Sequence, residues 1–237
     1  MQLEDDTLIT IPPSSTIRLD QLSKFKGTGL TDTVIDLSSG SMDASVAPSG
    51  NGVGRFEIRT PLAVTGVRGT RFRVDGSNDG LTSAVIEGSV RLQGRQGNTI
   101  SAPKVVRNGY ATRVHADGTL GGATRLLPAP QVGEPSPASG GQWQAKVEPV
   151  PGAVAYRVGI SRDAQGLYPV SSTVSQSPDV RFDTPGGGTF YMAVRAIDAQ
   201  GIGGHDAIQE FRTNVLLDSS GDAIVSDTVG SVSLTVY

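Results

Sequence analysis

Hydrophobic and polar positions alternate along most of this chain with a period of two residues. Phe72 and Val74 are apolar, whereas the neighbouring Arg71 and Arg73 are charged. Such alternation places one set of side chains in a core and the other in solvent, so it predicts half-buried β-strands rather than helices. Similar stretches recur at 85–92, 155–160 and 190–198.

Composition supports an all-β protein. The chain holds 31 Gly and 14 Pro in 237 residues, and short apolar runs are separated by Gly, Pro, Asp and Ser. Between the strands predicted at 70–74 and 85–92, the sequence DGSNDG at 75–80 supplies residues that tolerate positive φ. This segment therefore predicts a hairpin connection. The length favours two domains.

A proline-rich segment divides the chain. The sequence LLPAPQVGEPSPAS occupies residues 126–139. Its prolines predict an extended, semi-rigid linker at 127–140. We therefore expect a first β domain at 1–126 and a second at 141–213, which begins near Trp143, the only tryptophan. The tail at 214–237 predicts an extra β-strand or the cut end of a further repeat.

The segment between residues 60 and 92 carries a specific motif. Its positions are Thr60, Pro61, Ala63, Val67, Arg68, Gly69, Thr70, Phe72, Val74 and the run from Val85 to Val90. A weak internal repeat relates SSGSMDASV around Gly40 to IEGSVRLQG around Gly88. The motif resembles the core of the FecR domain, and this resemblance implies a coiled β-hairpin or β-roll fold for residues 1–126. It also implies a periplasmic or cell-envelope protein with a role in signal transduction.

The second half resembles a fibronectin type III domain through the segment GTFYMAVRAIDAQGIGG. The resemblance implies an immunoglobulin-like β-sandwich over 142–213, a class of module that serves as a spacer or adhesive surface. Phe190 stands where that family has its corner tyrosine. Because phenylalanine has no hydroxyl, we expect that tie to be absent or moved to Tyr191.

Arg68 has two interpretations. A half-buried arginine needs a partner, and Glu87 on the later ribbon is the candidate, which gives Arg68 a structural role. The alternative is direct contact with a ligand. Gly69 permits close approach of another backbone, and Gly88 interrupts its strand where a bulge or a close approach is expected.

Charge is distributed unevenly. The whole chain carries −3, yet residues 55–113 hold ten Lys and Arg against four Asp and Glu. Such a segment could face an anionic polymer such as peptidoglycan; alternatively, it pairs with the acidic N-terminal part or stays solvated. Only three aromatic residues in the segment argue against a nucleic-acid partner. The candidate binding residues are Arg71, Arg73, Arg91, Arg95 and Lys104.

No catalytic or metal-binding pattern is present in the sequence. His115 and His205 have no neighbours at metal-ligand spacing, and cysteine is absent. The oxygen-rich residues of 75–79 lack the later bidentate glutamate of a calcium loop, so they predict an ordinary turn. An envelope polysaccharide hydrolase would need a carboxylate pair such as Asp75 and Glu87. We therefore expect no enzyme activity, no cofactor and no metal, with the hydrolase as a remote alternative.

The sequence thus predicts a non-catalytic envelope binding or signalling module. Its expected partner is an envelope protein or an anionic glycan such as peptidoglycan, with no nucleic acid. The alternative is a structural spacer in a larger envelope protein. The acidic N-terminus and the lack of an apolar run near 18 residues predict neither an export signal nor a membrane segment within the sequence.

Overall fold

The computed structural model confirms the all-β class. Among the residues it describes, strands are joined by turns, and the helical structure consists of one 3-10 turn, η1 (Ser139–Gly141). None of the described residues forms a helix long and apolar enough to cross a membrane. The described residues are 2–3, 6–24, 31–47, 55–67, 69–77, 80–184, 186–213, 215–217 and 223–225.

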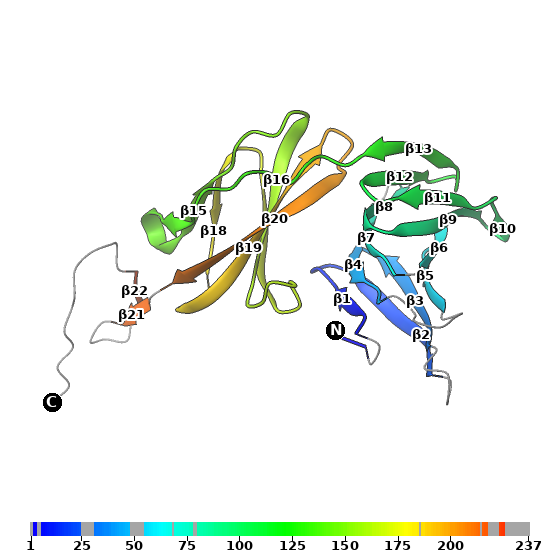
Figure 1. Ribbon diagram of the computed structural model, residues 1–237, viewed down its shortest axis with the longest axis horizontal. Coiled ribbons are helices and arrows are strands. Elements are labelled where there is room, and N and C mark those ends of the chain that lie inside the picture. The colour runs from blue at the N-terminus through cyan, green and yellow to red at the C-terminus, as the bar shows by residue number, and fades with distance from the viewer. Residues whose placement is uncertain are drawn as a thin grey trace. The chain divides into compact units, whose positions relative to one another are not determined.

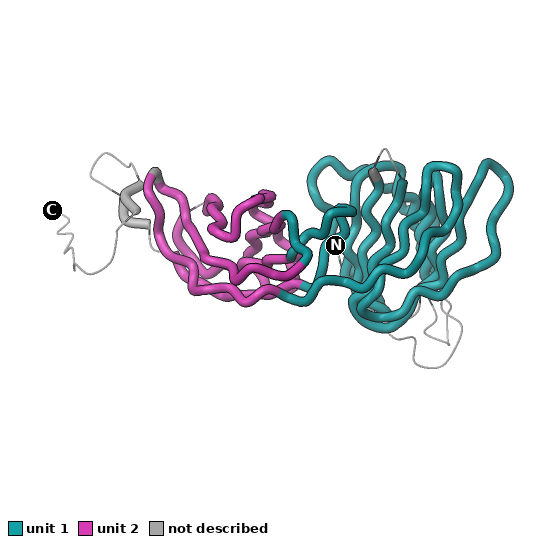
Figure 2. Tube along the Cα trace, turned by 90° about the horizontal axis from the view of Figure 1, so that it is seen from above, with its two compact units in different colours: residues 1–129, 152–154, 196–205 teal, residues 130–151, 155–195, 206–237 magenta. Residues whose placement is uncertain are grey.

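The chain forms two compact units whose segments interleave along the sequence (Figure 2). Unit 1 holds residues 1–129 together with 152–154 and 196–205. Unit 2 holds the remaining segments, 130–151, 155–195 and 206–237. Each unit is described separately below.

The first sheet of unit 1 has six strands in the order β1-β4-β7-β8-β12-β13, all antiparallel (Figure 1). The hairpin predicted at 75–80 joins β7 to β8. Asn78 and Asp79, the centre of that turn, lie outside the described residues. The strands are β1 (Leu8–Thr10), β4 (Ser41–Ser45), β7 (Arg71–Ser77), β8 (Gly80–Glu87), β12 (Tyr110–His115) and β13 (Leu120–Arg125).

The second sheet of unit 1 has the order β10-β9-β6-β5-β3-β2, and β11 also pairs with β9. Its pairs are antiparallel except β3 with β5, which run parallel. The strands are β2 (Thr16–Lys24), β3 (Thr31–Ser39), β5 (Arg55–Arg59), β6 (Ala63–Val67), β9 (Ser89–Gln96), β10 (Thr99–Ile100) and β11 (Lys104–Arg107).

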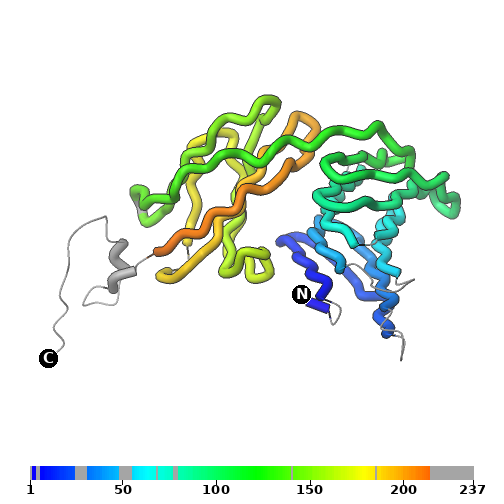
Figure 3. Tube along the Cα trace, in the orientation of Figure 1, coloured from blue at the N-terminus to red at the C-terminus, as the bar shows by residue number. Residues whose placement is uncertain are grey.

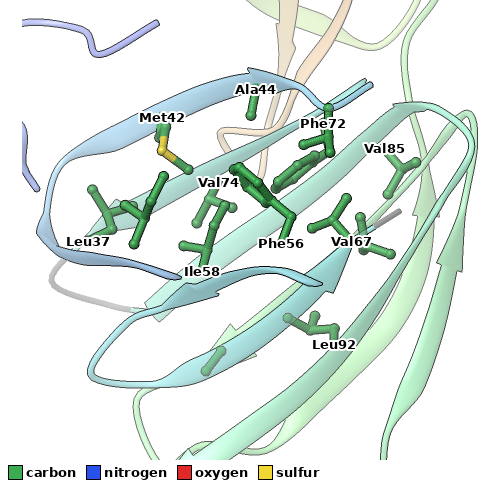
Figure 4. Close-up of a cluster of buried hydrophobic side chains, with 14 of the residues drawn as sticks. Leu37, Met42, Ala44, Phe56, Ile58, Val67, Phe72, Val74, Val85 and Leu92 are labelled. Carbon is green, nitrogen blue, oxygen red and sulfur yellow. The ribbon is translucent and has the colours of Figure 1, made fainter. Parts of the chain in front are cut away.

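The core of unit 1 is formed by the apolar half of each alternating strand. Figure 4 shows Phe56 and Ile58 of the second sheet pointing toward Phe72 and Val74 of the first. All four are at most 4% exposed. Because burying a large apolar side chain contributes about 1.5–3 kcal/mol, this row supplies much of the drive for folding. The opposite half of each strand faces outward and carries the charges considered below.

Glycines mark corners where the chain passes from one sheet to the other, as the trace in Figure 3 allows the reader to follow. Gly40 lies between β3 and β4 at φ +83°, and a Cβ there would stand 2.5 Å from the Cα of Ser15. Gly88 lies between β8 and β9 at φ +78°, and its Cβ would stand 2.7 Å from the carbonyl oxygen of Gly69. The two glycines that relate the weak repeat thus both occupy corners between the sheets, although the chain crosses from the second sheet to the first at Gly40 and from the first to the second at Gly88.

Unit 2 is an immunoglobulin-like sandwich of a four-stranded sheet, β17-β16-β19-β20, and a three-stranded sheet, β14-β15-β18. The ends of three of these strands, at 153–154, 196–198 and 203–205, belong to unit 1. Aromatic rings from both sheets meet in its core. The centroid of Phe211 lies 5.4 Å from Trp143, 5.6 Å from Phe182 and 6.0 Å from Phe190. The strands are β14 (Ser136–Pro137), β15 (Trp143–Lys146), β16 (Ala153–Ser161), β17 (Pro169–Ser175), β18 (Asp179–Phe182), β19 (Gly188–Asp198) and β20 (Gly203–Thr213).

A tyrosine ties the backbone of unit 2, but it is not Tyr191. Phe190 is fully buried, and the hydroxyl of Tyr156 on β16 accepts the amide hydrogen of Val150 at 2.9 Å. Tyr191 is instead accessible to solvent, where the negative charge of Glu210 raises the pKa of its hydroxyl. The expected move of the tie to Tyr191 is therefore wrong, because the strand next to β19 supplies the hydroxyl.

Part of the tail forms a short hairpin. β21 (Val215–Leu217) pairs antiparallel with β22 (Ala223–Val225). Residues 218–222 between these strands and the last segment, 226–237, lie outside the described residues.

Candidate functional site

The VRGT turn of the FecR-like motif lies at a third corner, where β6 of the second sheet leads into β7 of the first. Val67 ends β6 with its side chain buried, and Thr70 is 2% exposed. The Thr70 hydroxyl donates to the carbonyl of Ser89 at 2.9 Å, and its backbone exchanges two hydrogen bonds with Val46. These bonds join the corner to segments of both sheets, which gives the motif a bracing role.

The ion pair expected at this corner joins Arg68 to Glu87. Arg68 lies outside the described residues. Its predicted pairing with Glu87 therefore stays a prediction. Glu87 is exposed and is the Cα partner of Arg71 in the β7–β8 ladder. The ladder shifts register between Arg71 and Phe72, next to the Gly88 corner.

The five predicted binding residues lie on two different sheets. Arg71 and Arg73 belong to β7 in the first sheet, whereas Arg91 and Arg95 belong to β9 in the second. Lys104 opens β11, beside β9. The outward faces of the two sheets lie on opposite sides of the shared core, so these residues do not form one surface.

Arg73 is a buried structural residue within unit 1. It is 7% exposed, and its Nη1 donates to the carbonyl oxygens of Gly203 at 3.3 Å and Gly204 at 2.7 Å. Its Nε lies 3.5 Å from the carboxylate of Asp43 on β4. A guanidinium held in this way is removed from any surface ligand. Arg71, half-buried at the start of the same strand, keeps more exposure.

Arginines on the outward face of β9 and β11 are better placed. Val90 and Leu92 of β9 point into the core, so Arg91 and Arg95 point outward. Across the ladder, Arg91 faces Val105 of β11, and Arg95 faces Ile100 of β10. Val106 of β11 is buried.

Arg107 on β11 is a site residue that the sequence reasoning missed. Val105 is the Cα partner of Arg91, and Arg107 is the partner of Ser89, so both flank Arg91 on the outward face. The sequence KVVR has only four residues and does not alternate, so its pattern did not reveal the strand. Lys104 has the parity of the buried Val106, and its ammonium donates to the carbonyl of Gly121.

The other half of the same sheet is neutralised by ion pairs between β2, β3 and β5. The N–O distances are 2.6 Å for Arg18–Asp36, 2.7 Å for Arg55–Asp32 and 2.6 Å for Arg59–Glu57. The hydrogen bond from each guanidinium to its aspartate raises the pKa of Arg18 and of Arg55. Some of the basic segment thus does pair with acidic residues of the N-terminal part.

We call the remaining outward area the basic strip. Within the described part of the chain, Arg91 and Arg107 form no ion pair, while Arg95 donates to the Gly97 carbonyl at 3.1 Å. Such a surface can attract and hold anions through charge-assisted hydrogen bonds. The described residues contain no group of three or more metal-ligating side chains. The basic strip consists of Gly66, Arg91, Gln93, Arg95, Val105 and Arg107.

Comparison with known families bears out the FecR resemblance. The sequence model of the family described as FecR protein matches residues 1–91, which hold every strand from β1 to β8 and the VRGT corner. The match thus covers the greater part of both sheets of unit 1. A search of curated proteins finds no match.

Solved structures give weaker likenesses. Two crystal structures of a protein from Parabacteroides distasonis described as an anti-sigma factor align with 16% identity and a TM-score of 0.41. The alignment covers 53% of this chain and 54% of that one, so the chain spans about half of that protein's length. A two-domain fibronectin type III segment of chicken tenascin aligns with 10% identity and a TM-score of 0.31, covering 84% of this chain and 98% of that one.

Proposed function

We propose that this chain is a non-catalytic binding and signalling module of the bacterial cell envelope, acting in the periplasm through contacts with an envelope protein or an anionic glycan such as peptidoglycan. Two findings support the proposal. Residues 1–91 match the FecR family, and the second unit is a sandwich of a kind that serves binding and spacing.

The observation that carries a binding role is the charge on the basic strip. Arg91 and Arg107 stand outward without a carboxylate partner in the described chain, whereas Arg18, Arg55 and Arg59 on the same sheet face are each matched by one. Paired surface charges contribute little to attraction of a partner, while unpaired ones steer and retain anions.

For the organisation of the chain we retain, as part of the proposal, a FecR-like domain at 1–126, a linker at 127–140, a fibronectin-like sandwich at 141–213 and a tail at 214–237. The alternative function is a structural spacer with no ligand of its own. The hydrogen bonds of Arg73 and Thr70 favour the spacer alternative, because they give these residues of the motif region a role in stability and not in binding.

Pelleting with purified peptidoglycan sacculi tests the proposal. The chain is expected to sediment with sacculi at low salt and to be released as salt rises, because exposed charges are screened beyond about 10 Å at 0.1 M. Failure to pellet at low salt would remove the glycan from the proposal and leave a spacer or a module for a protein partner.

A further inference from the structure

We propose that the basic strip is a docking site for a glycan strand that carries carboxylates, lying along β9. This inference rests on the proposed function and names the ligand class and the residues that hold it. It departs from the sequence-based expectation, because it replaces Arg71, Arg73 and Lys104 with Gly66, Val105 and Arg107. The spacing of the cations, the open floor of the strip and the paired charges that border it favour such a ligand.

Two arginines of the strip lie at neighbouring positions of the β9–β11 ladder. Arg91 faces Val105 across the ladder, and Arg107 lies two residues further along β11, which makes the two arginines diagonal neighbours. Diagonal positions on an antiparallel pair are about 7–8 Å apart, within reach of long side chains. Their planar guanidinium groups match the geometry of a carboxylate. Together they can hold one anionic group from two sides.

A third arginine sets a repeat. Arg95 lies four residues after Arg91 on the same face, at a distance of about 13 Å for a rise of about 3.3 Å per residue. Gln93, between them, faces the same way and is half-buried. Two cationic positions separated by an amide fit a polymer with spaced carboxylates better than a single small ion.

The floor of the strip is open and apolar. Gly66 is the Cα partner of Arg91 and carries no side chain, and a Cβ built there would meet nothing nearer than the Arg91 carbonyl oxygen at 4.0 Å. Val105, on the other side of Arg91, is 54% exposed. The C–H faces of sugar rings can lie on such positions while their carboxylates reach the arginines, which favours a glycan as the occupant.

A carboxylate borders the strip on its far side. Glu57 is the Cα partner of Gly66 on β5 and is tied to Arg59 at 2.6 Å. Because both charges of this pair are compensated, β5 attracts an anion less strongly than β9 and β11, whose Arg91 and Arg107 form no ion pair within the described part of the chain.

Three variants test the strip by different routes. Arg91→Glu with Arg107→Glu reverses the charge, and Gly66→Val fills the floor without a strained φ. Arg125→Glu with Arg181→Glu changes the net charge equally at exposed positions outside the strip. We expect the first two variants to weaken sacculus binding about tenfold or more, a loss of about 1.4 kcal/mol. The control pair should bind nearly as tightly as the parent.

Folding is controlled in the same experiment. Gly66→Val should melt at or above the temperature of the parent, because a β-branched residue suits a strand interior. A variant that binds weakly while melting normally therefore reports on the site. If Gly66→Val binds sacculi as tightly as the parent, the glycan does not lie over Gly66. If the strip pair and the control pair lose equal affinity, the basic strip is not the binding site.

The ligand is tested with sacculi whose carboxylates have been converted to amides. Binding is expected to fall about tenfold or more on this probe, whereas equal binding would overturn the carboxylate. Tighter binding to walls that carry phosphate polymers, or full competition by poly-glutamate, would assign the strip to a phosphate polymer or an acidic polypeptide instead. A parent chain that fails to pellet ends the glycan proposal itself, while a parent that pellets with unaffected strip variants overturns the strip alone.

Discussion

Gly88 and Gly40 adopt positive φ at corners where another backbone stands where a side chain would be. For Gly88 the obstructing atom is the carbonyl oxygen of Gly69, and for Gly40 it is the backbone of Ser15. Because a backbone atom cannot rotate away as a side chain can, these corners fix how closely the two sheets of unit 1 approach. The residues are therefore required by geometry and not by any ligand.

Gly88→Ala should lower the free energy of unfolding of unit 1 by about 2 kcal/mol or more, through a strained φ and the 2.7 Å contact with Gly69. Gly97→Ala is the matched control, since Gly97 has φ +57° but nothing within 4 Å of a Cβ, and should cost about 1 kcal/mol. Amide exchange of β8 and β9 measures both. Equal losses in the two variants would contradict the close approach.

Tyr156→Phe should destabilise unit 2 by about 1–2 kcal/mol, because the buried amide of Val150 loses its acceptor. Tyr191→Phe is the control and should be nearly neutral, since that hydroxyl is accessible to solvent. Denaturation followed by the fluorescence of Trp143, the only tryptophan and a core residue of unit 2, gives the measurement. A neutral Tyr156→Phe would show that the tie carries no stability.

Arg73→Ala should lower the stability of unit 1 by about 1–3 kcal/mol, because the carbonyls of Gly203 and Gly204 lose a charged donor. Arg71→Ala, on the same strand but half-buried, should cost much less. Thermal melting followed by far-ultraviolet circular dichroism compares the two. A larger loss for Arg71 would refute the structural role of Arg73.

Arg73 also shows where prediction from sequence stops. Alternation correctly placed it opposite Phe72 and Val74, and so away from the core between the sheets. It could not show that residues some 130 positions later would cover this outward side chain. Period-two patterns report the face of a strand, whereas burial of that face depends on tertiary contacts.

Turns between strands carry their own titrating groups. Asp117, in the turn between β12 and β13, accepts hydrogen bonds from the hydroxyl of Thr119 at 2.7 Å and from its amide at 2.9 Å. Both favour the ionised carboxylate and hold the pKa of Asp117 below its ordinary value. The stabilisation is present above the unfolded-state pKa and is lost as pH falls through the lowered, folded-state pKa.

Thr119→Val should raise the pKa of Asp117 toward its ordinary value, because it removes the hydroxyl bond, the larger cause of the shift. Carboxyl ¹³C chemical shifts followed across the acidic range measure this titration. An unchanged Asp117 titration would contradict the assignment.

Strand identity could be predicted at the element scale, whereas the partners of each strand could not. The patterns around Phe72 and Leu92 indicated strands of the observed period. They contained no information on which of two sheets each strand joins, so Arg71 and Arg91 were grouped although β7 and β9 lie in different sheets. The sequence pattern also did not reveal β11, because a strand of four residues is too short to show a period.

At the scale of the molecule, the units do not follow the order of the chain. Unit 1 includes residues 196–205, and Ile202 of that segment is buried with Ala84, Ala111 and Leu126. The proline-rich composition of 127–140 indicated a linker, but composition cannot reveal that a later segment belongs to the first unit. The FecR resemblance, in contrast, was visible from a short motif and is matched over 1–91.

A fragment ending at residue 126 should therefore be less stable than unit 1 in the whole chain. It exposes Ala84 and Ala111 and leaves Arg73 without the two glycine carbonyls. Amide exchange of β7 and β8 in the fragment and in the full chain makes the comparison. Equal protection would show that residues 196–205 add nothing to the stability of unit 1.

The most direct test of the glycan account is the mapping of backbone amide shifts by NMR during titration with soluble, carboxylate-bearing peptidoglycan fragments. The account predicts that the largest changes lie on β6, β9 and β11, around Gly66, Arg91 and Arg107, and that they diminish at high salt. Changes centred on Arg71, changes confined to unit 2, or no changes at millimolar fragment would contradict it.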